Sequence, residues 1–257
     1  MVFTPPDARH AEVAIVVDVL RASSTIVTAL AAGRRRVLCC GDVEGAERLR
    51  VPGRALAGER GCRPIPGFDY GNSPAAPRED ECEDLVLCTT NGSPAIVTAA
   101  GVADEVLVGS LLNLEALIDA VPANADVTVI CAGTDGRLAL EDAYVAGRIV
   151  AGLGHARTDA ARAAERLAGA YPEPVEALAE SADAATLRAV GAEGDIAFCA
   201  RESVLAVVPR VAEASHDMAV VEERSGHGPD PSRLGHRAAA GASESGPIPN
   251  TISAKAM

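Results

Sequence analysis

Three short polar turns carry the side chains in this sequence that are best suited to chemistry. They are residues 18–25, 89–94 and 131–137, and each follows a short apolar segment and precedes an alanine-rich one. If the apolar segment is a strand and the alanine-rich segment a helix, each turn exposes free backbone N–H groups at the positive end of a helix dipole. The carboxyl ends of parallel strands meet at one edge of a sheet. The sequence therefore predicts a single site for phosphate or another small anion, built from all three turns.

The first turn combines a carboxylate with a guanidinium group. Asp18 ends an apolar segment, where its carboxylate can bind a ligand or, more simply, cap the following helix. Arg21 stands at the start of that helix, where a cation opposes the helix dipole. A bound anion would offset this unfavourable interaction. Asp18 and Arg21 are therefore our first catalytic candidates.

Two glycine-bounded loops precede the second turn. Residues 58–61 place an acid and an arginine between glycines, and residues 67–74 bring together a carboxylate, an amide and a hydroxyl group. A solvated ion pair and an Asx-turn before proline are the simpler interpretations of these loops. In the turn itself, helix capping accounts for Ser93 but not for Thr90 and Asn91 as well.

An acidic pair follows the third turn. Glu141 and Asp142 are adjacent, so on a helix they diverge by about 100° and only one of them points inward. Mg²⁺ takes carboxylates and waters as ligands and often bridges to a substrate phosphate. We therefore expect Asp18, Asp69 and one of this pair to hold Mg²⁺. The alternative is that the pair is ordinary surface in a very acidic protein.

Cys131 and Arg137 offer a different chemistry, because their C-x₅-R spacing after a strand is typical of phosphatases that attack phosphate with a thiolate. A helix N-terminus and a nearby arginine would lower the pKa of such a thiol. Leu138 stands where those enzymes usually have Ser or Thr, and the nearby carboxylates oppose thiolate formation. Otherwise Cys131 is a small buried residue at the end of a strand.

An α/β protein is needed to position these side chains. We predict strands at residues 13–17, 37–40, 55–57, 85–88, 105–108 and 127–130, and helices at 25–32, 44–50, 94–100, 114–120, 140–152, 157–169 and 173–190. Residues 61–84 hold too many prolines and glycines for regular structure, and two apolar segments, 196–199 and 204–208, follow the last helix. The alternation predicts a layered α/β/α fold with a doubly wound, mostly parallel sheet.

We expect one α/β domain over residues 1–224 and a disordered tail over 225–257, which is rich in Gly, Ser, Pro and Ala. The sequence Ile-Val-Thr-Ala occurs at both 26–29 and 96–99. It raises the alternative of two similar lobes, about 1–100 and 101–224, although chance similarity of two alanine-rich helices explains it as well.

The composition narrows the classes of partner and compartment. The net charge is −13 and Lys255 is the only lysine, so the surface repels nucleic acid. The seven cysteines show neither a C-x-x-C pair nor zinc-ligand spacing, which indicates reduced thiols. No segment resembles a signal peptide or a membrane span. We expect a cytoplasmic enzyme with no nucleic-acid or membrane partner, and the sequence leaves a homo-oligomer open.

Several of these motifs, in a fixed order over about residues 13–221, resemble those of 2-phosphosulfolactate phosphatases. The segments that carry the resemblance are residues 18–25, 58–60, 67–74, 89–93, 109–113, 131–142, 194–199 and 207–209. The resemblance implies a Mg²⁺-dependent hydrolase with layered helices and sheet. It also implies that the enzyme removes phosphate from 2-phospho-3-sulfolactate, giving 3-sulfolactate on the route to coenzyme M.

Together these observations predict metal-assisted hydrolysis of a small anionic phosphoester. We expect catalysis by Asp18, Arg21, Glu141 and Asp142, and Mg²⁺ binding by Asp18, Asp69, Glu141 and Asp142. We expect substrate binding by Ser24, Thr25, Arg60, Asn72, Ser73, Thr90, Asn91, Gly92, Gly133, Thr134 and Arg137. Direct attack by water is favoured over a phosphoenzyme at Asp18, because Leu20 occupies the position of the second aspartate in the haloacid-dehalogenase pattern.

Two alternative functions stay open. One is a phosphatase for another small phosphorylated carboxylate, such as 2-phosphoglycolate or 2-phospholactate. The other is a homologue that binds anions without catalysis.

Overall fold

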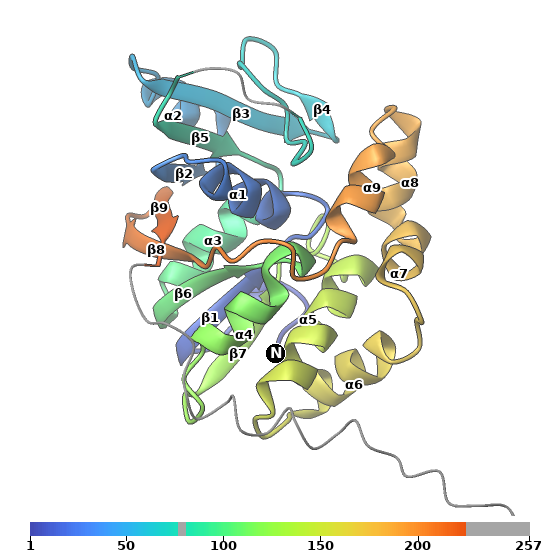
Figure 1. Ribbon diagram of the computed structural model, residues 1–257. Helices are drawn as coiled ribbons and strands as arrows, with labels where there is room; N and C mark the ends of the chain where they lie inside the picture. The colour runs from blue at the N-terminus through green and yellow to red at the C-terminus, as the bar shows by residue number, and fades with distance from the viewer. Residues whose placement is uncertain (77–80, 225–257) are drawn as a thin grey trace, which may run out of the picture.

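The computed structural model describes residues 1–76 and 81–224, and a nine-stranded sheet runs through this part of the chain (Figure 1). The strand order is β4-β3-β5-β2-β9-β8-β6-β1-β7. The strands are β1 (Ala11–Val17), β2 (Arg36–Cys40), β3 (Arg54–Arg60), β4 (Arg63–Pro64), β5 (Asp84–Cys88), β6 (Ala103–Gly109), β7 (Val127–Cys131), β8 (Pro209–Ala214) and β9 (Met218–Glu223). All six predicted strands are present.

The sheet consists of two parallel blocks joined by an antiparallel hairpin. One block is β3-β5-β2 and the other is β6-β1-β7, and β8 and β9 lie between them. Of the eight strand pairs in the described residues, four are parallel and four antiparallel. The sheet is therefore mixed, and the prediction of a mostly parallel sheet holds only within each block.

The connecting hairpin lies in a region that the sequence left unassigned. Of the two apolar segments found there, 196–199 lies in a helix and 204–208 has no regular structure. The strands follow at β8 and β9, where Glu213, Glu222 and Glu223 interrupt the apolar residues. Because β8 is exposed over its second half, it lacks the continuous apolar run of a buried strand.

The two blocks run in opposite directions, because three antiparallel pairings separate them: β2 with β9, β9 with β8, and β8 with β6. In a flat sheet their carboxyl ends would lie at opposite edges. Neighbouring strands twist by about 20–25°, so the five steps from β5 to β1 add up to about 100–125°. This accumulated twist turns the carboxyl ends of the two blocks toward a common side.

Helices cover both faces of the sheet. The central strand β1 is buried on both faces, with Ala14 and Val16 in the cluster around α1 and α3, and Ile15 and Val17 in the cluster around α4 and α5. The helices are α1 (Ala22–Ala31), α2 (Val43–Arg48), α3 (Gly92–Ala100), α4 (Leu114–Ala120), α5 (Leu140–Leu153), α6 (Asp159–Ala168), α7 (Pro174–Glu180), α8 (Ala182–Ala189) and α9 (Gly194–Cys199). The layered α/β/α arrangement follows from these two clusters.

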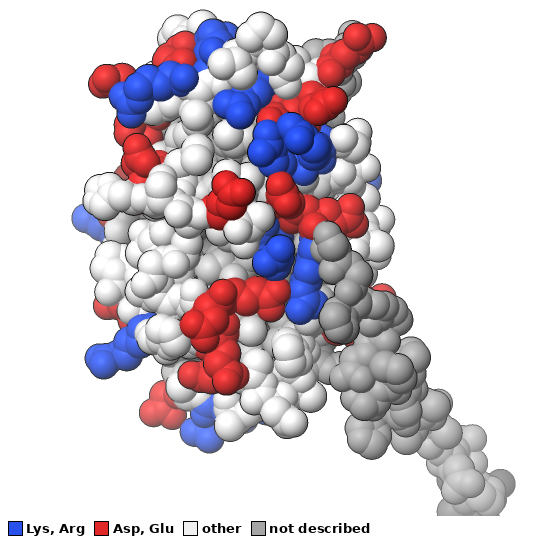
Figure 2. All heavy atoms as spheres, turned by 90° about the vertical axis from the view of Figure 1, so that its left-hand side faces the viewer, with Lys and Arg blue, Asp and Glu red and all other residues white. Residues whose placement is uncertain are grey.

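The helices after α5 form a cap on the right-hand side of Figure 1. The predicted helix over 173–190 is divided at Ser181, whose hydroxyl accepts from the backbone N–H of Ala184 and so caps α8. No helix in the described residues is long and apolar enough to cross a membrane. On the face that Figure 2 shows, arginines lie interspersed with acidic side chains.

The division into two similar lobes is not confirmed. Strand β1, from the first of the expected lobes, pairs with β6 and β7, which come from the second. Helix α1 then returns the chain to β2 in the other block. The expected disordered tail, 225–257, lies outside the described residues.

Candidate active site

All three polar turns meet at one cavity of about 200 Å³, which we call the inner cavity. Asp18 and Arg21 reach it from the first turn, Thr90 and Asn91 from the second, and Thr134 and Asp135 from the third. The turns precede α1, α3 and α5, so the N-terminal ends of three helices point to this region. The structure therefore confirms the prediction that the three turns converge.

Asp18 is buried at the end of β1, where its backbone and one carboxylate oxygen are held locally. Its Oδ1 accepts from the backbone N–H of Ala22 at 3.1 Å, and its own N–H donates to Ser23 Oγ at 2.8 Å. Its Oδ2 makes no hydrogen bond to a described residue and lies against Gly92, where a Cβ would come within 2.4 Å of it. Burial raises the pKa of Asp18 to about 7, against the opposing effect of the Ala22 hydrogen bond. One oxygen is thus left for a ligand.

Arg21 is buried and held by two fixed acceptors. Its Nη1 donates to Asp195 Oδ2 at 2.7 Å, and its Nη2 donates to the backbone carbonyl of Cys62 at 3.0 Å. Asp195 also accepts from Ser73 Oγ at 2.6 Å. A guanidinium group has five N–H donors, so most remain for a bound anion. Asp195, from α9, was not among the predicted site residues.

Asp142 ties the first turn to the third. Its Oδ1 accepts from the backbone N–H of Val19 at 2.9 Å, and its Oδ2 accepts from that of Gly133 at 3.1 Å. Burial and the neighbouring carboxylates of Glu141 and Asp18 raise its pKa well above the usual range. Because both oxygens are engaged by backbone donors, Asp142 positions the two turns.

Glu141, the other member of the acidic pair, is also buried. It is hydrogen-bonded to Asp183 of α8, and burial followed by the charge of Asp183 raises its pKa to about 8. Asp183 lines the inner cavity and also accepts from Thr134 Oγ1 at 2.7 Å. Glu141 therefore acts on the cavity through Asp183.

A tight hairpin places Thr134. The backbone groups of Thr134 and Arg137 exchange two hydrogen bonds of 3.0 Å, and both residues between them, Asp135 and Gly136, have positive φ. This is the geometry of a type I′ turn, for which Asp-Gly is a favoured pair. Gly133 also has positive φ, and a Cβ there would lie 2.3 Å from the Arg137 carbonyl oxygen. Arg137 is exposed on this hairpin and does not line the inner cavity.

The geometry opposes a thiolate at Cys131. The side chain is buried, and burial followed by the charge of Asp142 raises the pKa of its thiol well above the usual range. A lowered thiol pKa is what a nucleophilic cysteine requires. The exposed Arg137 does not contact it. Cys131 is a small buried residue at the end of β7, and all seven cysteines of the chain are free thiols.

Several residues that the sequence analysis did not select line the inner cavity, among them Glu59, Asp135, Asp183 and Thr186. Glu59 accepts from the backbone N–H of Thr90 at 2.8 Å and from that of Cys62 at 2.9 Å. It therefore joins the turn between β3 and β4 to the second polar turn. Asp183 and Thr186 come from α8. The glycines at 58 and 61 were a usable signal for Glu59, whereas nothing in the polar sequence of α8 distinguishes its two residues.

Arg60 and Asp69 are two of the predicted site residues that do not line the inner cavity. The guanidinium group of Arg60 donates to the backbone carbonyls of Glu59 and Cys88. The carboxylate of Asp69 accepts from the backbone N–H of Leu56 at 2.8 Å and fixes the following loop to β3. The prediction that Asp69 shares a metal ion with Asp18 has no support in this arrangement.

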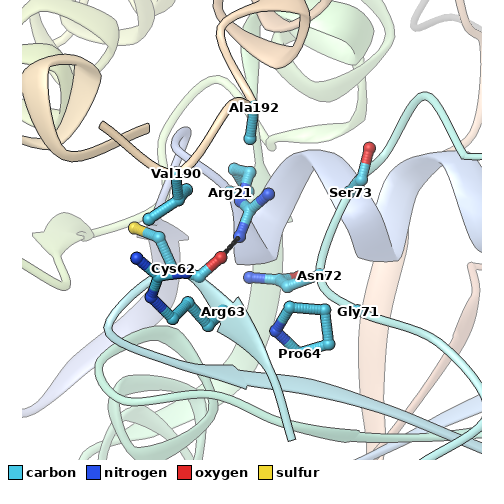
Figure 3. Close-up of a pocket in the computed structure, with 9 residues that line it drawn as sticks. All are labelled: Arg21, Cys62, Arg63, Pro64, Gly71, Asn72, Ser73, Val190 and Ala192. Atoms are coloured by element: carbon cyan, nitrogen blue, oxygen red, sulfur yellow. Dashed lines mark hydrogen bonds between the residues drawn. The ribbon is translucent and has the colours of Figure 1, made fainter. Parts of the chain in front are cut away.

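Of the predicted residues in α1, Ser24 closes the first turn and Thr25 holds the 67–74 loop in place. Ser24 Oγ donates to the Val19 carbonyl, and Thr25 Oγ1 donates to the Asn72 carbonyl, both at 2.9 Å. Asn72 is buried, lines the inner cavity and has a side-chain oxygen, Oδ1, with no partner in the described residues. Ser73 lines a neighbouring cavity with Arg21 and Asn72 (Figure 3).

The inner cavity fits a divalent cation by its charge, although not by a ready-made cage. In the described residues there is no group of three or more His, Cys, Asp or Glu side chains arranged to hold a metal ion. Magnesium, however, is usually held by one or two carboxylates together with waters and phosphate oxygens. Asp18 and Asp183 both line the cavity, and their mutual repulsion helps to raise the pKa of Asp18. These two carboxylates, with Glu141 behind Asp183, suit such an ion.

Comparison with known proteins identifies the family. The model of the 2-phosphosulpholactate phosphatase family matches residues 3–214. The chain belongs to this family of phosphoric monoester hydrolases. It is 38% identical over 217 residues to a probable 2-phosphosulfolactate phosphatase of Thermotoga petrophila, covering 81% of this chain and 93% of that protein. Proteins of the same description from Thermus thermophilus and Deinococcus radiodurans are 39% and 38% identical, covering 80% and 79% of this chain and 92% and 89% of theirs.

Proposed function

We propose that the protein hydrolyses 2-phospho-3-sulfolactate to 3-sulfolactate and inorganic phosphate, with Mg²⁺ as its cofactor. The observation that carries this proposal is the convergence of three helix-preceding turns on one cavity that contains a buried arginine and a carboxylate with a free oxygen. The family adds the substrate, because its members carry the name of this activity. If the organism makes coenzyme M, the product would enter that route.

In the proposed reaction a water molecule attacks phosphorus and the bond from phosphorus to the substrate oxygen breaks. The departing alkoxide takes up the proton that the attacking water loses, so that the alcohol and inorganic phosphate are released. Arg21 would bind the phosphoryl oxygens with its remaining N–H groups and stabilise the charge that develops there. The backbone N–H groups at the start of α3 would add to this stabilisation, since they carry the positive end of that helix dipole.

Asp18 and Asp183 are the residues that would hold Mg²⁺ in this cavity. The ion would draw negative charge off the phosphoryl group when bound. Asp142 contributes by holding the first and third turns at a fixed separation through Val19 and Gly133. Glu59 does the same for the second turn through Thr90.

The experiment that tests this function is a phosphate-release assay on 2-phospho-3-sulfolactate, 2-phospholactate and 2-phosphoglycolate. We expect turnover of the first substrate with added Mg²⁺, loss of turnover with EDTA, and recovery when excess Mg²⁺ is restored. Turnover of only the substrates without sulfonate would assign the protein to another phosphorylated carboxylate. Release of no phosphate from any of them, by a folded protein with Mg²⁺ present, would contradict the proposal.

Direct attack by water and a phosphoenzyme at Asp18 give different products in a second experiment. Hydrolysis in ¹⁸O-labelled water followed by acid quenching would detect a phosphorylated aspartate only on the second route. We expect none, and a trapped phosphoaspartate at Asp18 would replace the direct mechanism.

A further inference from the structure

The cavity next to the inner one, which we call the outer cavity, has a volume of about 360 Å³. The two cavities share Arg21, Cys62 and Asn72, so they adjoin at these side chains. The outer cavity adds Arg63 of β4, and Val190, which follows α8, lies across from it (Figure 3). A ligand centred on Arg21 can therefore extend into both spaces.

The two cavities differ sharply in charge. Four carboxylates line the inner cavity with a single arginine; they belong to Asp18, Glu59, Asp135 and Asp183. The outer cavity is lined by two arginines, Arg21 and Arg63, and by no acidic residue. Its cysteine, Cys62, is neutral at physiological pH because burial raises its thiol pKa to about 11. The outer cavity is thus built to attract an anion and the inner cavity to attract a cation.

Arg63 is an exposed arginine that lines the outer cavity without a partner of its own among the described residues. Within the described part of the chain its guanidinium group makes no hydrogen bond or ion pair, whereas Arg21 and Arg60 are both engaged. Asn72 lines the same cavity, and its amide nitrogen points toward Cys62 and Arg63 (Figure 3). Its N–H₂ group can therefore donate to an anion bound there.

We propose that the outer cavity binds the sulfonate group of the substrate and that Arg63 is the residue that selects for it. This inference rests on the proposed function. In 2-phospho-3-sulfolactate the carboxylate is bonded directly to the carbon that carries the phosphate, whereas the sulfonate is one methylene further away. The group that reaches beyond Arg21 into a separate cavity is therefore the sulfonate. It is permanently anionic, and its oxygens suit the forked N–H groups of arginine.

The test compares wild type with Arg63→Gln on three substrates. They are 2-phospho-3-sulfolactate, 2-phospholactate, which lacks the sulfonate, and the phosphate ester of isethionate, which lacks the carboxylate. Loss of a charge-assisted hydrogen bond lowers affinity about 10- to 100-fold. We expect this loss in kcat/KM for both sulfonate substrates, mainly through KM, and less than about a threefold change for 2-phospholactate. The matched control is Arg9→Gln, because Arg9 is exposed before β1, at the opposite end of that strand from Asp18.

Each other outcome overturns the inference in a recognisable way. An equal loss on all three substrates would make Arg63 a general structural or phosphate-binding residue. A loss confined to the two carboxylate substrates would assign Arg63 to the carboxylate, and no loss would remove it from the site. If wild type hydrolyses none of them, the proposed function fails separately. Calorimetric binding of 3-sulfolactate to wild type and to Arg63→Gln then decides on Arg63 alone.

Discussion

Replacement of Asp195 by alanine is the perturbation whose effect the structure defines best. Arg21 and Asp195 form a 2.7 Å ion pair in which the two side chains are only 5% and 6% exposed. The change leaves Arg21 buried with its charge uncompensated, and Ser73 loses the acceptor at 2.6 Å. Breaking a buried ion pair from one side typically destabilises a protein by about 3–5 kcal/mol, because the remaining charge is desolvated and unpaired.

A loss of this size is easy to measure. For a domain of this length each 1 kcal/mol lowers the melting temperature by about 2–4 °C, so we expect a decrease of about 6–20 °C. The chain has no tryptophan, so unfolding is best followed by far-ultraviolet circular dichroism, in urea and on heating. Asp195→Asn keeps an acceptor for only one of the two donors and should fall between the variant and wild type. We also expect kcat/KM of Asp195→Ala to fall at least about tenfold, because Arg21 is no longer aimed at the substrate.

The double variant Arg21→Ala/Asp195→Ala separates this mechanism from a simple loss of packing. If the unpaired charge causes the damage, removing Arg21 as well restores part of the stability, and the two changes are far from additive. Asp104→Ala is the control, since its ion pair with His10 is exposed on both sides and should change the free energy of unfolding by less than about 1 kcal/mol. A loss below about 1 kcal/mol for Asp195→Ala, or additivity in the cycle, would refute the reasoning.

Three further substitutions test the proposed reaction. Gly92→Ala places a methyl group 2.4 Å from Asp18 Oδ2 and should reduce phosphate release at least about tenfold, whereas Gly101→Ala, whose nearest atom lies at 3.4 Å, should not. Asp18→Asn should abolish turnover with the circular dichroism spectrum unchanged. The pKa of Asp18 rises from 3.8 to about 7 on folding, so its stabilising effect is complete below pH 3.8 and is lost as pH rises through 7. Without metal, melts at pH 5 and pH 8 should therefore show a smaller decrease for Asp18→Asn than for wild type, and an equal decrease would disprove the raised pKa. Cys131→Ser should keep its EDTA-sensitive activity, and loss of activity in the serine variant, with wild-type activity that survives EDTA, would restore the thiolate mechanism.

The sequence was sufficient to predict the elements that carry Asp18, Thr90 and Thr134, because each follows a buried apolar strand and precedes a helix. These are local signals. The same logic placed Glu141 and Asp142 behind the third turn, but its expectation that only one of them points inward was wrong, because both are buried. Nor did it predict the bonds of Asp142 to two backbone N–H groups. Such bonds depend on how two distant turns pack, which residue spacing does not encode.

The sequence failed where a side chain's direction, or its neighbour in space, decides its role. Glu59 and Arg60 are adjacent on β3, and the pleat of a strand sends adjacent side chains to opposite faces. The arginine was the obvious anion ligand by type, yet it is the carboxylate that faces the cavity. Asp183 could not be found either, because its helix is polar and only tertiary packing brings α8 over the third turn.

The position of the site also explains why the β8–β9 hairpin, which carries none of its residues, matters to it. Asp18 and Thr134 come from the β6-β1-β7 block, whereas Glu59 and Thr90 come from the β3-β5-β2 block. The two blocks are antiparallel, and the hairpin supplies three of the five pairing steps between β5 and β1 over which the sheet twists. Without those strands the turns would lose the rotation that brings them to one side. The geometry of the cavity therefore depends on residues 209–223, which lie late in the sequence and contact no part of it.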